Sequence, residues 1–178
     1  MYPTFHAKHR RLQTSLDGLL RQLENYSEQQ LKAQPVPGAW SALQVMQHLM
    51  VAEKLSVLSI QRRIDKGMNF RKTNLQSWSR EVLLAFSLRI PLKFKAPTAV
   101  ADELFSADAT FATVSAEWSA ARNDLAEFLG KLPSELARKQ IYRHPRGGWM
   151  SAVGMLDFFI VHFDRHCKQI ERTLKLSL

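Results

Sequence analysis

The chain has 178 residues, of which 46% are hydrophobic and 23% charged, and its formal net charge is +9. This length and balance exclude a disordered tail and predict one domain over residues 1–178. No run of about 18 apolar residues is present and the N-terminus lacks a signal-peptide core, so we expect a cytoplasmic protein with no membrane partner. A single cysteine, Cys167, excludes an internal disulfide and a cysteine-based zinc site.

The first predicted element is an amphipathic helix over residues 8–27, where leucines recur at helical spacing. We expect the start of the chain, with His6 and His9, to be mobile. Prolines and a glycine in QPVPGAW end this element. Ser41 followed by Gln44 then predicts a capping box that begins a second helix. This helix is expected to continue to about Ile64.

The pattern breaks over residues 65–105, which predicts a long crossover with a short helix near residues 76–90. A third helix is expected over residues 107–131, and a fourth from Ser151 as N-cap to about Leu174. Residues 137–144 are the one candidate for a short extended piece. The predicted fold class is therefore all-α, a four-helix bundle in which the crossover lets the second and third helices run in the same direction.

Two histidines in the stretch VHFDRHCKQI, His162 and His166, lie four residues apart on the inward face of the last helix. They are either core histidines with satisfied ring nitrogens or two ligands of a metal ion. His48 lies on the inward face of the second helix, and bundles build metal sites from such facing side chains. Three imidazoles with an open position are typical of a catalytic zinc- or nickel-type site.

Four polar residues lie near these histidines in the sequence. Gln44 and Gln169 either hydrogen-bond a ligand or belong to the polar helix surface. Glu53 and Asp164 follow His48 and His162 by five and two residues, which rotates both carboxylates away from the histidine face. Both are left out of the site, and no catalytic residue beyond the metal ligands is assigned.

Four other residues receive structural interpretations. His144 precedes Pro145 and is interpreted as a turn residue that fixes entry into the last helix. Cys167 is turned about 100° from its neighbour His166, which indicates an ordinary half-buried thiol. Trp40 and Trp149 each precede a helix cap and are expected to plug the ends of the core.

The lysines and arginines gather in residues 62–72, 89–95 and 138–146, which are predicted connections. Scattered basic loops are common in soluble proteins, so solvated loop charge is the simpler interpretation and nucleic-acid binding is not expected. The charge also suits an anionic small-molecule substrate. The alternative to an enzyme is a non-catalytic basic bundle that binds nucleic acid or another polyanion.

Three motifs, in order, resemble the DinB-like (YfiT-like) superfamily of metal-dependent proteins. They are Trp40-Ser41 with His48, the turn of His144 and Pro145 with Gly147 or Gly148, and His162, His166, Gln169 and Ile170. The resemblance implies an up-down-down-up bundle, often a homodimer, with a divalent zinc, nickel or manganese ion on His48, His162 and His166. Members include thiol-dependent S-transferases and a related isomerase that use a low-molecular-weight thiol. This implies a metal-dependent transferase or hydrolase that acts on a small-molecule substrate. The long, basic segment 65–105 departs from the family pattern, so the resemblance does not identify that substrate.

Overall fold

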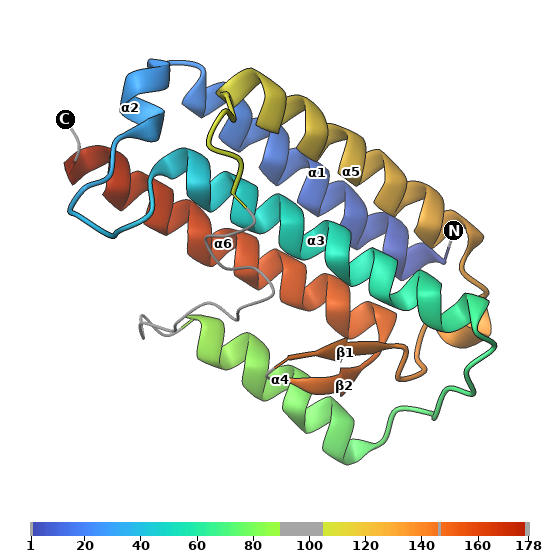
Figure 1. Ribbon diagram of the computed structural model, residues 1–178. Helices are drawn as coiled ribbons and strands as arrows, with labels where there is room; N and C mark the ends of the chain where they lie inside the picture. The colour runs from blue at the N-terminus through green and yellow to red at the C-terminus, as the bar shows by residue number, and fades with distance from the viewer. Residues whose placement is uncertain (1, 90–104, 146, 177–178) are drawn as a thin grey trace.

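The computed structural model describes residues 2–89, 105–145 and 147–176. The elements in chain order are α1 (Pro3–Leu23), α2 (Glu28–Lys32), α3 (Ala42–Asp65), α4 (Leu75–Arg89), α5 (Phe111–Lys131), the 3₁₀ turn η3 (Ser134–Leu136), β1 (Tyr142–His144), β2 (Gly148–Met150) and α6 (Ala152–Leu176). Four long helices, α1, α3, α5 and α6, form the bundle (Figure 1). Helices α3 and α5 run in one direction and α1 and α6 in the other. The predicted all-α, up-down-down-up bundle is therefore confirmed.

Hydrogen-bonded caps fix where the helices begin. Ser41 Oγ accepts from the backbone N–H of Gln44 at 3.2 Å, while Gln44 Oε1 accepts from the N–H of Ser41 at 2.9 Å. This is the predicted capping box, which satisfies two otherwise unpaired N–H groups. Ser151 Oγ accepts from the N–H of Gly154 at 2.9 Å, as expected for the N-cap of the last helix.

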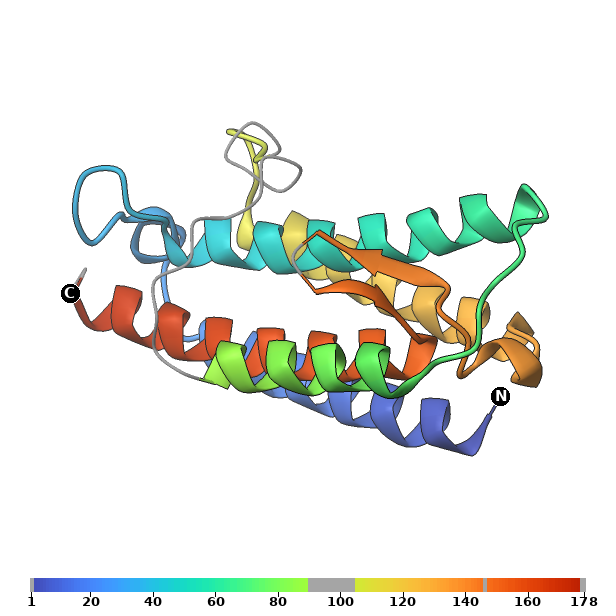
Figure 2. The same ribbon diagram turned by 90° about the horizontal axis from the view of Figure 1, so that it is seen from below.

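Helix α4 covers one side of α6, and a small hairpin packs against α4 and α3 (Figure 2). Strands β1 and β2 pair antiparallel, with Tyr142 opposite Met150, so the extended piece expected within residues 137–144 is present. The Glu81 carboxylate of α4 accepts from the Ser151 N–H at 2.7 Å, at the first turn of α6. A Cβ at Gly154 would lie 2.6 Å from Glu81 Oε2, so a larger residue there would displace the Glu81 carboxylate.

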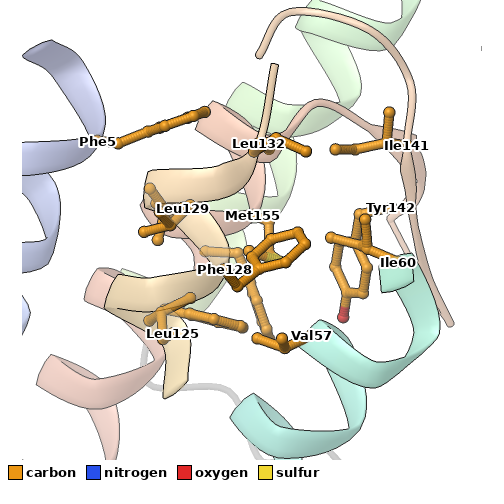
Figure 3. Packing of buried hydrophobic residues seen from close by; sticks show 14 of the residues in the cluster. Phe5, Val57, Ile60, Leu125, Phe128, Leu129, Leu132, Ile141, Tyr142 and Met155 are labelled. Atoms are coloured by element: carbon orange, nitrogen blue, oxygen red, sulfur yellow. The ribbon is translucent and has the colours of Figure 1, made fainter. Parts of the chain in front are cut away.

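The core consists of two clusters of buried apolar side chains. Figure 3 shows the first, where Phe5, Val57, Phe128, Tyr142 and Met155 bring together α1, α3, α5, β1 and α6. The second lies toward the other end of the bundle. Its fully buried members include Leu16, Leu23, Leu31, Met46 and Trp118. In the described part of the chain, no helix combines the length and apolar composition needed to cross a membrane.

The structure corrects three expectations. Helix α1 begins at Pro3 and includes both early histidines, and His9 Nε2 lies 3.0 Å from the carbonyl oxygen of Arg122. The short helix α2 was missed because its five residues are too few for a periodic pattern. Helix α5 begins at Phe111, where Thr110 supplies a capping box with Thr113. Of the crossover expected over residues 65–105, residues 90–104 lie outside the described residues.

A buried ion pair joins α3 to α5. Glu53 accepts from Arg122 Nη2 at 2.8 Å and from Trp118 Nε1 at 3.1 Å, and the Arg122 side chain is fully buried. Burial raises the pKa of the Glu53 carboxyl, while the Arg122 guanidinium acts in the opposite direction. Glu53 thus points away from the histidines, as predicted, and it anchors the helix that carries His48.

Replacing Glu53 by Gln should lower the free energy of unfolding by about 3–5 kcal/mol, because the guanidinium of Arg122 would be left buried without its carboxylate. Urea titration followed by circular dichroism measures this loss. Combining Glu53→Gln with Arg122→Met should recover part of it. Glu127→Gln, which removes a solvent-exposed pair with Lys131, is the matched control and should leave the midpoint unchanged. A single Glu53→Gln variant as stable as the wild type would contradict this prediction.

Candidate metal centre

His48 comes from α3, two turns after its capped start, and is 4% exposed. His162 and His166 come from the middle of α6, and their ring centroids lie 4.6 Å apart. The packing of α3 against α6 brings His48 Nε2 to 3.2 Å from His162 Nε2. The candidate ligand atoms of all three histidines lie within 4.8 Å of one another. The three imidazoles that the sequence singled out therefore converge on one point.

The distance between His48 Nε2 and His162 Nε2 fits a shared cation. Two zinc–nitrogen bonds of about 2.05 Å at a tetrahedral angle separate their nitrogens by about 3.3 Å, close to the observed 3.2 Å. Three neutral imidazoles are also a ligand set that zinc and nickel accept in proteins. The group of residues present therefore fits a divalent transition-metal ion.

Burial keeps the imidazoles of His162 and His166 neutral. It lowers the pKa of His162 well below the ordinary value, and the neighbouring His166 and His48 lower it further. Burial and His48 lower the pKa of His166 to about 3, against the opposing hydrogen bond to Gln169. At neutral pH the ring nitrogens consequently offer lone pairs, which a metal ion requires.

Gln169 orients one of the three rings. Its Oε1 lies 2.8 Å from His166 Nδ1, so the Nδ1–H donates to the amide and the lone pair stays on Nε2. This is the arrangement of a partner that holds a metal-ligating histidine in the required tautomer. Gln44, the other glutamine considered from the sequence, is instead engaged in the capping box of α3.

Aromatic side chains enclose the histidines. Phe158 stacks on His162 with a centroid distance of 4.9 Å and an interplanar angle of 21°. Trp40 lies against His48 at 5.0 Å, and the edge of Phe105 meets Trp40 at 5.2 Å. Trp40 was expected only as a plug at a helix end, and its contact with His48 depends on the tertiary packing. The site therefore has apolar walls that limit access of water.

Arg165 adds positive charge beside the rings. It lies between His162 and His166 in sequence, and its charge lowers the pKa of both. Arg165 was not predicted as a site residue, although it lies one residue before His166 in the sequence. A cation at this place favours an anionic ligand or substrate group.

The remaining candidates lie outside the cluster. His144 Nδ1 accepts from the Gly147 N–H at 2.8 Å, which agrees with its interpretation as a turn residue. Cys167 is half-buried and packs against the second core cluster, where burial raises the pKa of its thiol to about 12. Asp164 is exposed and lies 3.3 Å from Arg11 Nη2. Trp149 stacks under Arg63, whose guanidinium carbon is 4.8 Å from the ring centroid.

Two cavities in the described part of the protein lie away from the three histidines. The larger, about 430 Å³, lies between α3 and α5, with Val57, Leu58 and Phe128 among its lining residues. The smaller, about 210 Å³, adjoins Gln47 and Met50. Neither of these two cavities therefore contains the residues with metal-binding chemistry.

Comparison with known proteins identifies the family. The model of the DinB superfamily matches residues 11–170, which is nearly the whole chain. No curated protein matches the sequence.

Replacing His162 by Ala should abolish metal retention, because two imidazoles remain where three converged, while helical circular dichroism stays largely intact. Elemental analysis after reconstitution of untagged protein with zinc, nickel or manganese measures this. His6→Ala removes an exposed histidine outside the site and should keep the wild-type metal content. Stoichiometric metal in the His162→Ala variant, or none in the wild type, would contradict the prediction.

Replacing Gln169 by Leu should weaken metal affinity by about 10- to 100-fold, because His166 Nδ1–H loses the acceptor that fixes its tautomer. Competition with a chromophoric chelator measures the affinity. Gln169→Glu retains an acceptor oxygen and should stay closer to the wild type. Equal affinity in the Leu variant would mean that Gln169 has no orienting role.

Proposed function

Because the chain belongs to the DinB superfamily, we propose that it is a divalent-metal-dependent enzyme that transfers a small thiol, or water, to an electrophilic substrate. The observation that carries this proposal is the convergence of His48, His162 and His166 in a buried site. Three ligand positions from the protein leave coordination positions for a small molecule. Zinc, nickel and manganese are the candidate ions.

The bound ion would supply Lewis acidity, which lowers the pKa of a coordinated thiol or water so that a nucleophile is available at neutral pH. In the substitution form of the reaction, a sulfur–carbon bond forms as the bond from carbon to the leaving group breaks. The thiol proton departs with the leaving group or to solvent. In the hydrolytic form, water takes the place of the thiol.

The protein's own residues would position the reactants. Gln169 holds His166 in one tautomer, and Phe158 fixes the plane of His162 by stacking. Trp40 covers His48 and limits entry of water, which strengthens electrostatic interactions in the site. The charge of Arg165 would stabilise an anionic nucleophile or an anionic substrate group. The small-molecule substrate of this proposal is therefore anionic or becomes so during the reaction.

The alternative of a basic, non-catalytic bundle gives no role to three converging imidazoles, and their convergence favours the enzyme. Metal content separates the two functions, since only the enzyme requires a stoichiometric ion. The homodimer that the family resemblance implies stays a prediction.

Metal-reconstituted wild-type protein should accelerate conjugation of a low-molecular-weight thiol to a generic electrophile. Bacillithiol, mycothiol and glutathione are the thiols to compare, with mass spectrometry of the conjugate as the readout. The His162→Ala variant should show no acceleration, and His6→Ala should match the wild type. A fully metallated wild type that neither conjugates any of these thiols nor hydrolyses the electrophiles would rule out the proposed reaction.

A further inference from the structure

Helix α4 packs against α6 and yet exposes several apolar side chains. Its inner side buries Ser77 and holds the Glu81 carboxylate against α6. Its outer side carries an aliphatic stripe, defined here as Leu75, Val82 and Leu83, which are 78%, 48% and 64% exposed. Offsets of seven and eight residues place these side chains on one helix face. An exposed apolar group of this kind typically marks an interaction surface.

A cluster of like charges precedes the stripe. Lys72 and Lys139 lie directly opposite each other in an isolated antiparallel bridge. Backbone hydrogen bonds hold them there, from Thr73 N–H to the Arg138 carbonyl at 3.3 Å and from Gln140 N–H to the Arg71 carbonyl at 2.9 Å. We call Arg71, Lys72, Arg138 and Lys139 the basic bridge. Within the described ranges, none of these four forms an ion pair with an acidic residue.

This pairing is unfavourable in the isolated molecule, because like charges directly opposite each other destabilise a β pair. An anionic partner would reverse the sign of that interaction. The basic bridge is therefore expected to bind anionic groups, which would offset the repulsion between its lysines.

The aliphatic stripe and the basic bridge lie near each other. Lys72 precedes Leu75 by three residues, so the bridge adjoins the start of α4. Figure 2 shows α4 and the hairpin on the same side of the molecule, with the connection from α3 running beside them. Arg143 of β1 is exposed and pairs with Trp149 of β2. The basic bridge and the aliphatic stripe thus adjoin each other on the face of the molecule that carries α4.

We propose that this face is a peripheral binding surface for an anionic phospholipid bilayer. The aliphatic stripe would enter the boundary between headgroups and acyl chains, and the basic bridge would contact the anionic headgroups. A nucleic acid would use the same cations but gives no role to three exposed aliphatic side chains. The expectation of no membrane partner rested on the lack of a spanning segment, which a surface contact does not require.

Co-sedimentation with vesicles tests the proposal on the full chain. Wild-type protein should bind vesicles of phosphatidylcholine with phosphatidylserine at low ionic strength, bind pure phosphatidylcholine far less, and dissociate at high salt. Lys72→Gln with Lys139→Gln should weaken binding about 30-fold, since each basic side chain near an anionic surface contributes about 5-fold. Val82→Gln with Leu83→Gln should weaken it by at least tenfold, because these side chains no longer enter the bilayer.

Matched controls keep the result specific to this face. Leu55→Gln with Leu58→Gln removes two aliphatic side chains of α3 that are each 42% exposed, and Lys54→Gln with Lys168→Gln removes two exposed lysines elsewhere. Both controls should bind vesicles as the wild type does, and circular dichroism checks that every variant is folded. The proposal is overturned if the wild type does not bind phosphatidylserine vesicles, or if the Val82→Gln, Leu83→Gln variant binds them equally well. Salt-dependent binding of duplex DNA without vesicle binding would assign the face to nucleic acid and overturn it too.

Discussion

The candidate site depends on one packing constraint, the antiparallel contact of α3 with α6, which brings one imidazole of the first helix to two of the second. Burial removes water from ring nitrogens that each require a partner. Gln169 satisfies one of them, and a direct contact of 3.2 Å joins His48 to His162. A divalent ion at the point of convergence would satisfy three lone pairs at once. Desolvation therefore raises the free-energy cost of burying these histidines, and it also leaves their lone pairs available to bind a metal ion.

Much of the fold could be predicted from the sequence, because local signals are strong where they set helix starts and inward faces. Ser41 and Ser151 cap the helices that carry the three histidines, and both caps were visible as side-chain types at the expected spacing. The convergence of His48 with His162 followed from the bundle architecture. These features need only helical periodicity, capping chemistry and the expectation that polar side chains on inward faces meet.

Other features depend on contacts between residues far apart in the sequence, and local sequence patterns do not predict such contacts. Glu53 was correctly excluded from the histidine face, but its pairing with Arg122 requires knowledge of how α3 and α5 are aligned. The sequence did contain an indication of this pair, since the charged residue Arg122 follows Trp118 by one turn on an apolar helix face. The covering of His48 by Trp40 likewise arises from tertiary packing. A buried charge on a predicted core stripe is thus a useful sign of a partner on a neighbouring helix.

The reciprocal hydrogen bonds between Ser41 and Gln44 fix the residue at which α3 begins, and His48 follows Ser41 by seven residues, close to two full turns. Each added or deleted residue in that interval would swing the imidazole about 100° around the helix axis, out of the dry interior. Length changes ahead of the cap leave its direction untouched. We therefore expect the chain to tolerate insertions in the loop before Trp40 but not in the two turns that follow. In those turns the number of residues after the cap sets the direction in which the His48 side chain points.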